Sequence, residues 1–413
     1  MMNLMRPIRR LFGSQPEMPF VIPGRSDADV RSAFLDRMAR LENFVWLLNR
    51  MPAAVPPPLR LSPAIPSPDD QSLVKRVMAA YRRAVGSFIP AGGLWEGRAL
   101  DLKKRIHDAL AGDDTLSAAA VLRDPAASDF FWGFDAISSS PFGDPEPHEL
   151  VVRRLNSQAD WRELYALWLC DALISLSEAV GARRADYPEI DVDQTLAGRG
   201  KVFDVDGIID EIEQEIGVQL DFPNPFPNEL GLRCKRGIIG FRAIQSAYQG
   251  WRIAQLASHK PDFSVLEIGA GLGRTAYFAR LFGVRNYTIV DIPLTNAAQG
   301  YFLGRTLGEH NVRLGGEQGN QSLRVVPGTD LQALDQTYDL VVNVDSWTEM
   351  PKDIALSYWN IARKTAPLVL SINHEFNPHT VRDLYKSGTG ARVTRFAYPM
   401  RRGYIEEIIS FAD

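Results

Sequence analysis

Apolar residues follow two different spacings in the second half of the chain. From residue 264 onward, short apolar runs alternate with longer segments in which apolar residues recur every three or four positions. The first spacing predicts β-strands and the second predicts α-helices. The predicted strands cover 264–268, 286–290, 323–327, 338–344 and 367–373, and the predicted helices cover 273–282, 294–308, 353–364 and 379–387. Because alternating strands and helices form parallel sheets, we expect a doubly wound α/β fold with helices on both faces of the sheet.

The first half of the chain shows mainly helical spacing. Helices are expected over 71–85, 99–110 and 160–180, and Gly181 would end the last of these. Apolar residues between 26 and 48 predict another helix, whose apolar face either packs on the protein's own core or forms a dimer. Prolines between 52 and 69 exclude a helix or an inner strand, so this stretch is a linker or a strap.

These patterns predict three parts of the chain. Prolines interrupt residues 1–25, which we expect to be a mobile N-terminal segment. Residues 26–200 would form a helical cap region, and residues 201–413 would form the α/β domain. Oligomers, if they form, would use the N-terminal helices. Four aromatic residues near the middle of the cap region would either join its core or offer a stacking surface to a sugar: Phe130, Phe131, Trp132 and Phe134.

Composition limits the classes of partner and compartment. The 413 residues carry a net charge of −4, which gives no overall basic field and does not favour nucleic acid as a partner. Cys170 and Cys234 are the only cysteines, too few for a disulfide framework and too far apart for a zinc cluster. No apolar run has the length of a signal peptide or of a transmembrane helix. We therefore expect a soluble, cytoplasmic protein.

Charge is distributed unevenly just before the α/β domain. Seven acidic residues and no basic residue lie between Asp204 and Asp221, where the apolar positions keep a helical spacing. We expect these acids to form the solvent face of a helix. From Leu230 to Pro261 the sign reverses, and six basic residues occur without an acid. This basic block either binds an anionic group of a substrate or forms another solvated face. Its members are Arg233, Lys235, Arg236, Arg242, Arg252 and Lys260.

A glycine turn follows the first predicted strand of the α/β domain. Glu267 lies near the end of that strand, and the turn has glycines at alternate positions: Gly269, Gly271 and Gly273. A dinucleotide fingerprint would need its third glycine at position 274, which is occupied by Arg274, so the spacing does not favour NAD. Asp291 ends the next strand, where a carboxylate can accept two hydrogen bonds from a ribose diol.

Two stretches carry a resemblance to known families. The sequence VLEIGAGLG, followed by YTIVDIP, resembles the cofactor half of a class I S-adenosylmethionine (SAM) methyltransferase, whose Rossmann-like sheet has seven strands and an antiparallel last strand. The hairpin expected from strands 392–398 and 404–411 agrees with that sheet. The segment DLVVNVDSWTEMP at 339–351, with Ser371, Ile372 and Asn373, is similar to bacterial sugar O-methyltransferases.

The resemblance implies a role for several strand-end residues. Glu267 and the turn formed by Gly269, Ala270, Gly271 and Gly273 would hold the methionine end of SAM. Asp291 and Ile292 would hold the ribose and one face of the adenine. Asp330 occupies a position at which members of the family often have a group that contacts the adenine amine; alternatively, Asp330 caps a helix that starts at Leu331. We expect the second half of the chain to bind SAM by itself.

Methyl transfer to a hydroxyl group needs a base that takes the proton. Three residues at the ends of the fourth and fifth predicted strands are candidates for this catalytic role: Asp345, Glu349 and His374. Asp345, Glu349 and Glu375 could also hold magnesium through oxygen, but their spacing matches no recognised metal motif, and no metal is expected.

The favoured interpretation is a SAM-dependent O-methyltransferase that acts on a sugar hydroxyl in a nucleotide sugar, a glycan or a glycosylated metabolite. A methyltransferase for another class of small molecule, with the helical first half as substrate cap, is the second interpretation. A non-catalytic protein that keeps the fold for assembly is the third, although such a protein could have lost the glycine turn, which is intact here.

Overall fold

The structure of the protein is a computed structural model that describes residues 54–63, 69–86, 98–128, 130–131, 134–135, 160–185, 201–257, 260–334, 336–386 and 390–411. The chain divides into two compact units, which are described separately. In the smaller unit, β1 (Ala54–Val55) pairs in parallel with β3 (Lys201–Val202). The larger unit contains the sheet, the glycine turn and all the predicted site residues.

Eight strands of the larger unit form one mixed sheet. Their order is β12, β13, β11, β10, β6, β7, β9, β8. The strand β13 runs antiparallel to both of its neighbours, and all the other neighbouring pairs are parallel. This arrangement confirms the predicted α/β class and the antiparallel last strand of the methyltransferase sheet. The bounds are β6 Ser264–Ile268, β7 Asn286–Asp291, β8 Val312–Leu314, β9 Leu323–Pro327, β10 Leu340–Val344, β11 Leu368–His374, β12 Ala391–Ala397 and β13 Tyr404–Phe411.

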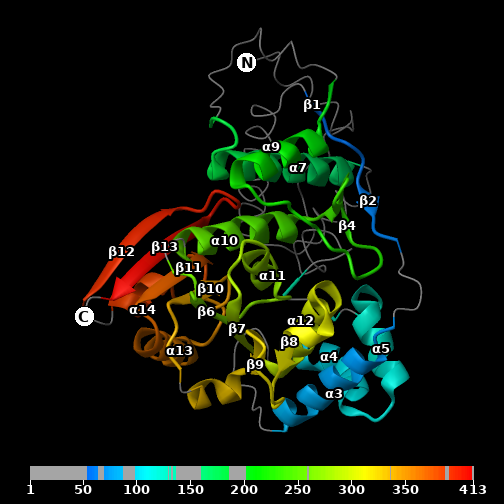
Figure 1. Cartoon of the computed structure of the whole chain (residues 1–413), viewed down its shortest axis with the longest axis vertical. Coiled ribbons are helices and arrows are strands. Elements are labelled where there is room, and N and C mark those ends of the chain that lie inside the picture. Colours follow the sequence, from blue (N-terminus) through cyan, green and yellow to red (C-terminus); the bar gives the residue numbers. More distant parts are fainter. Residues whose placement is uncertain are drawn as a thin grey trace, which may run out of the picture. The chain divides into compact units, whose positions relative to one another are not determined.

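Helices cover both faces of this sheet (Figure 1). One face carries α10 (Phe241–Ala257), α11 (Arg274–Leu281) and α12 (Pro293–Leu307), and the other carries α13 (Lys352–Thr365) and α14 (Val381–Lys386). Ala355, Trp359 and Ala362 recur at helical spacing along α13 and are buried against alternate residues of the strands. Two short 3-10 helices, η2 (Glu309–Asn311) and η3 (Gly328–Ala333), complete the connections.

The predicted strands and helices of residues 264–411 are all confirmed to within two residues at each end. The edge strand β8 was not predicted, because it has only three residues and its apolar run is too short to stand out. The sequence also did not predict β4 (Leu230–Cys234) and β5 (Gly237–Ile239), which form a small antiparallel sheet with β2 (Arg60–Leu61). In that sheet β2 is an edge strand, as the surrounding prolines require.

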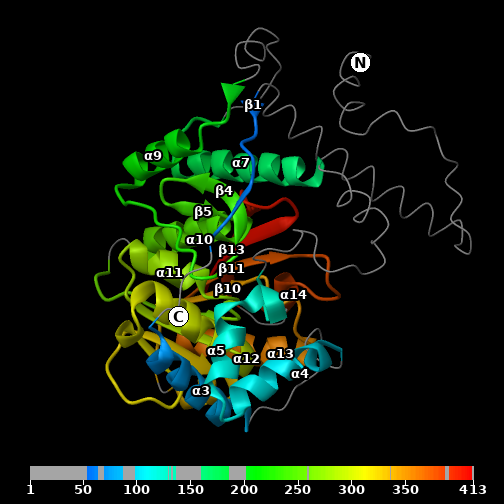
Figure 2. The ribbon, with the colours of Figure 1, turned by 90° about the vertical axis from the view of Figure 1, so that its right-hand side faces the viewer.

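Several helices of the first half belong to the same compact unit as the sheet. They are α3 (Gln71–Val85), α4 (Arg98–Ala111), α5 (Thr115–Arg123) and the 3-10 helix η1 (Pro125–Ser128). Both views show α3 beside α12 (Figures 1 and 2). Asp70, just before α3, joins the two helices because it accepts hydrogen bonds from Arg123, Tyr301 and Arg305.

The other predictions for the first half have mixed outcomes. Phe130 and Phe131 are buried, and Phe131 packs edge-to-face on Phe226 at 5.0 Å between ring centroids, so these two aromatic residues are part of the core. The helix α7 (Asp160–Val180) is present, and Gly181 ends it with a φ of +90°. Trp132, the mobile segment 1–25 and the helix expected over 26–48 lie outside the described residues. The boundary near residue 200 stays a prediction.

Two residues of the basic block pair with acids of the acidic helix. The helix α9 (Val205–Ile216) buries its apolar face as expected, but Glu213 binds Arg236 at 3.1 Å and Asp210 binds Lys235. The expectation that these acids only face solvent is therefore wrong for Glu213, which is largely buried. No helix among the described residues is both long and apolar enough to cross a membrane.

Candidate active site

The glycine turn joins β6 to α11 in a conformation that other residues rarely adopt. Gly269, Gly271 and Gly273 have φ values of +73°, +55° and +87°. Space around the turn is also restricted, since a Cβ atom on Gly269 would lie 2.2 Å from the Ser346 Oγ atom. The turn therefore requires glycine for its backbone and lets that backbone approach a neighbouring group closely.

Glu267 is buried at the end of β6 with one carboxylate oxygen unpaired. Its Oε2 atom accepts a hydrogen bond of 2.9 Å from the Tyr287 hydroxyl, whereas Oε1 has no hydrogen-bond partner among the described residues. Burial raises the pKa of Glu267 to about 8, although the Tyr287 hydrogen bond opposes the shift. An unpaired buried carboxylate oxygen fits a ligand that brings its own donor, such as an ammonium group.

Asp291 ends β7 and is tied to the glycine turn. Its Oδ1 atom accepts the Ile292 N–H at 2.8 Å, and its Oδ2 atom accepts the Gln299 side-chain amide at 2.8 Å. The same amide nitrogen donates to the Gly271 carbonyl at 2.8 Å, so Gln299 fixes the strand end and the turn together. Burial raises the pKa of Asp291 to about 7. Sequence reasoning missed Gln299, which is fully buried; the available signal was a glutamine among the small and apolar residues of the predicted helix 294–308.

Among the described residues, Asp330 makes no hydrogen bond to this group. It is exposed, and it lies in the first turn of η3, which begins at Gly328. Its carboxylate accepts a hydrogen bond from the neighbouring Thr329 hydroxyl at 3.2 Å. The alternative role as a cap of a helix starting at Leu331 is wrong, because the helix starts three residues earlier. The contact with adenine stays a prediction.

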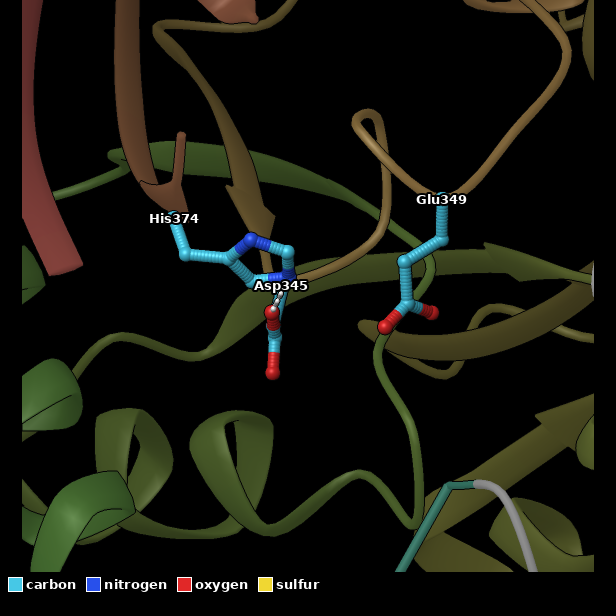
Figure 3. A group of neighbouring side chains, drawn as sticks. All are labelled: Asp345, Glu349 and His374. Atoms are coloured by element: carbon cyan, nitrogen blue, oxygen red, sulfur yellow. Dashed lines mark ion pairs between the residues drawn. The ribbon is translucent and has the colours of Figure 1, made fainter. Parts of the chain in front are cut away.

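The three candidate bases come together at the carboxyl edge of the sheet. Asp345 and Glu349 follow β10, His374 ends β11, and one ligand atom of each lies within 4.8 Å of the others (Figure 3). The carboxyl ends of adjacent parallel strands meet at one edge, which explains why residues nearly thirty positions apart are neighbours. Asp345 has a φ of +53°, which is uncommon outside glycine and is often found at functional sites.

Asp345 is engaged on several sides. It accepts a hydrogen bond of 2.8 Å from the Tyr404 hydroxyl, and its Oδ1 atom lies 3.5 Å from His374 Nε2. The guanidinium groups of Arg401 and Arg242 lie 3.5 Å and 3.9 Å from its Oδ2 atom. Such a carboxylate is held in place by its neighbours, which suits a positioning role better than the role of a base.

One ring nitrogen of His374 is in a hydrogen bond, and the other lies near Asp345 without one. Nε2 faces Asp345, and Nδ1 accepts the Phe376 N–H at 3.3 Å. Because Nδ1 accepts this hydrogen bond, the neutral ring carries its proton on Nε2. In that tautomer neither nitrogen has a lone pair available for the proton of a substrate.

Glu349 is the candidate with an available carboxylate. Among the described residues, no group hydrogen-bonds to its side chain. Burial, assisted by the charge of Asp345, raises the pKa of Glu349 to about 7, and Arg242 and Arg401 oppose this shift. A carboxylate with a pKa near neutrality can take a proton at physiological pH and release it again. The geometry therefore favours Glu349 over the other two candidates as the base.

Amide and hydroxyl groups lock the strand ends beneath this cluster. The Asn343 side chain donates to the Ile268 carbonyl at 2.8 Å and to Ser346 Oγ at 2.6 Å, and it accepts a hydrogen bond from Asn373 at 2.9 Å. These contacts connect β6, β10 and β11 where each one ends. Asn343 and Asn373 are thus buried positioning residues rather than groups that face a substrate.

The sequence favoured a site without metal, and the three oxygen ligands that it offered as the alternative do not form one group among the described residues. Glu375 points away to form an ion pair of 2.5 Å with Arg395, so it does not join Asp345 and Glu349. The group that could offer metal ligands is instead Asp345, Glu349 and His374. The two guanidinium groups beside Asp345 would repel a divalent cation, which makes this cluster a poor metal site.

The sheet, the turn and the strand-end cluster define a protein with the class I methyltransferase fold. No protein-family model matches the chain, and no curated protein matches it either. Solved methyltransferase structures do match, and each is covered over most of its own length.

Three of these structures illustrate how distant the similarity is. Magnesium protoporphyrin IX methyltransferase (ChlM) from Synechocystis PCC 6803 with bound SAM is 18% identical, with a TM-score of 0.30 over 42% of this chain and 86% of its own. The glycopeptide N-methyltransferase MtfA complexed with sinefungin is 15% identical, with a TM-score of 0.33 over 41% and 87%. The O-methyltransferase TomG from Streptomyces achromogenes is 16% identical, with a TM-score of 0.29 over 40% and 80%. At these values the matches identify no family and no substrate for this chain.

Proposed function

We propose that the protein is a SAM-dependent O-methyltransferase that methylates a sugar hydroxyl of a small-molecule or glycan acceptor in the cytoplasm. The observation that carries this proposal is the available carboxylate of Glu349, which titrates near neutrality at the strand ends next to the glycine turn. A base in this position is what transfer to a hydroxyl group requires.

The residues present fit the cofactor. The unpaired oxygen of buried Glu267 suits the ammonium of the methionine end, and Asp291 retains lone pairs for the ribose hydroxyls. The turn of Gly269, Ala270, Gly271 and Gly273 lets the backbone approach that end, and Ile292 would contact the adenine. Bound SAM would supply an electrophilic methyl group on its sulfonium.

The chain's own residues would then handle the proton. When a hydroxyl group of the acceptor is methylated, the Glu349 carboxylate would take the hydroxyl proton. Asp345 holds the site in shape through Tyr404 and His374, and its negative charge keeps the Glu349 carboxylate a stronger base. The reaction leaves a methyl ether, a neutral thioether and a protonated Glu349.

Two features of the surroundings support an anionic sugar as the acceptor. Arg242 and Arg401 share the single carboxylate of Asp345, so the site has guanidinium groups to contribute to an anion such as phosphate. Phe376, two residues after His374, is 93% exposed, and an exposed aromatic ring is a stacking surface for a sugar. Of the basic block predicted from sequence, Arg242 is the member that reaches this cluster, and Arg401 joins it from the hairpin.

The direct test is a search for the product. Metabolite extracts, nucleotide sugars and glycans would be incubated with the purified protein and SAM labelled in its methyl group. Mass spectrometry should then find an acceptor that gains one labelled methyl group on oxygen, with wild-type protein and not with Glu349→Gln. Transfer to nitrogen or carbon, or to an acceptor without a sugar, would overturn the proposed substrate class.

A further inference from the structure

The backbone at Phe134 lies against the glycine turn. A Cβ atom placed on Gly271 would be 3.1 Å from the Phe134 carbonyl oxygen, so the two backbones are in van der Waals contact. Phe134 comes from the first half of the chain, more than a hundred residues before the turn. A carbonyl oxygen in this position is a hydrogen-bond acceptor next to the backbone that would hold the methionine end of the cofactor.

A buried ion-pair network holds this contact in place. Arg274, the first residue of α11, donates from Nε to Asp135 Oδ2 at 3.0 Å, and its NH2 group lies 3.3 Å from Glu229 Oε2. The three side chains are each less than a tenth exposed. Removing one partner from such a buried network leaves an uncompensated charge, so the network specifies one position for the chain at Asp135.

The ion-pair network therefore explains why an arginine occupies position 274, directly after the glycine turn. Arg274 stands where a dinucleotide fingerprint has its third glycine, and it uses that position to anchor a segment from elsewhere in the chain. We propose that Phe134 and Asp135 are part of the cofactor site and that the first half of the chain is needed to bind SAM. This inference rests on the proposed function, and it replaces the expectation that the second half binds SAM by itself.

The test compares two equally buried aspartates in the full-length protein. Asp135→Ala breaks the network at the turn, and Asp70→Ala breaks the similarly buried network between α3 and α12, away from the turn. Binding of S-adenosylhomocysteine, the demethylated product of SAM, would be measured by calorimetry, and thermal unfolding would be recorded beside it. Asp135→Ala should weaken binding by about tenfold or more. Asp70→Ala should lower the melting temperature with an affinity within about twofold of wild type.

Hydrogen exchange on the wild-type protein gives a second measurement in case Asp135→Ala does not fold. Saturating S-adenosylhomocysteine should slow amide exchange in the peptide that contains Phe134 and Asp135, with a smaller change in α4. Equal affinities of the two variants, or unchanged exchange at Phe134 in a wild-type protein that binds the ligand, would overturn this inference alone. A wild-type protein that does not bind the ligand would contradict the proposed function as well.

Discussion

At the scale of single residues, one cluster contains three titratable groups in three different situations. Asp345 is held by Tyr404 and two guanidinium groups, His374 accepts a hydrogen bond at Nδ1, and Glu349 is available. The sequence could place all three at one edge of the sheet, because the carboxyl ends of parallel strands meet there. It could not rank them, because the ranking depends on contacts with Tyr404, Arg401 and the Phe376 amide.

The ranking predicts how three variants differ. Glu349→Gln should lower kcat by about a hundredfold or more while S-adenosylhomocysteine binding is retained, because the base is lost and the cofactor contacts remain. His374→Ala and Asp345→Asn should cost less in kcat than Glu349→Gln. The wild-type rate should rise with pH through about 7 as Glu349 ionises. A Glu349→Gln variant with near-normal turnover, or a larger loss in His374→Ala, would contradict the ranking.

Replacing Glu267 should change the stability of the protein and its binding of S-adenosylhomocysteine in opposite directions. Its pKa is about 8 in the folded protein against 4.5 for the ordinary group, so the folded state holds a proton that the unfolded state releases. The free energy of unfolding should therefore fall as pH rises from about 4.5 to 8. Glu267→Gln should melt at a higher temperature than wild type at pH 8, with little difference at pH 4.5, and should bind S-adenosylhomocysteine more weakly. Equal melting temperatures at pH 8 would contradict the buried, unpaired state of this carboxyl group.

At the scale of elements, the periodicity of residues 264–411 was enough to predict the sheet and its helices. The sequence missed β8 and the small sheet of β2, β4 and β5, whose strands are too short for their spacing to be recognised. It also missed Tyr404 and Arg401 as site residues. The antiparallel last strand was expected and places Tyr404 opposite His374 at the carboxyl edge, but periodicity does not show that the Tyr404 hydroxyl and the Arg401 guanidinium group reach Asp345.

The basic block provides a matched pair of variants at this scale. Arg236 lies on the turn between β4 and β5 and is paired with Glu213, whereas Arg242, near the start of α10, reaches Asp345. Once an acceptor is known, Arg242→Ala should raise its KM by about tenfold, because a charged contact to an anionic group is lost. Arg236→Ala should leave KM unchanged and lower only the melting temperature. If both variants leave KM unchanged, the acceptor binds without this contact.

At the scale of the whole molecule, the chain combines a sheet that its sequence predicts with a first half that gives few signals. The contacts of Asp70 with α12, and of Asp135 with Arg274, join residues more than a hundred positions apart. The spacing of apolar residues does not predict such contacts, because each contact depends on one side chain of a loop. Formal net charge was equally uninformative, since it does not show that Lys235 and Arg236 pair with acids of α9 whereas Arg242 reaches Asp345.

The central claim is that the glycine turn binds SAM, and calorimetric titration of the full-length protein with S-adenosylhomocysteine tests it most directly. Gly271→Val places a side chain at the turn, while Gly217→Val makes the same change at a positive φ after α9, where the surroundings are open. Wild type and Gly217→Val should bind one molecule of S-adenosylhomocysteine per chain, Gly271→Val should bind none, and NAD should bind to none of the three proteins. Unchanged affinity in Gly271→Val, or binding of NAD in place of S-adenosylhomocysteine, would contradict the claim.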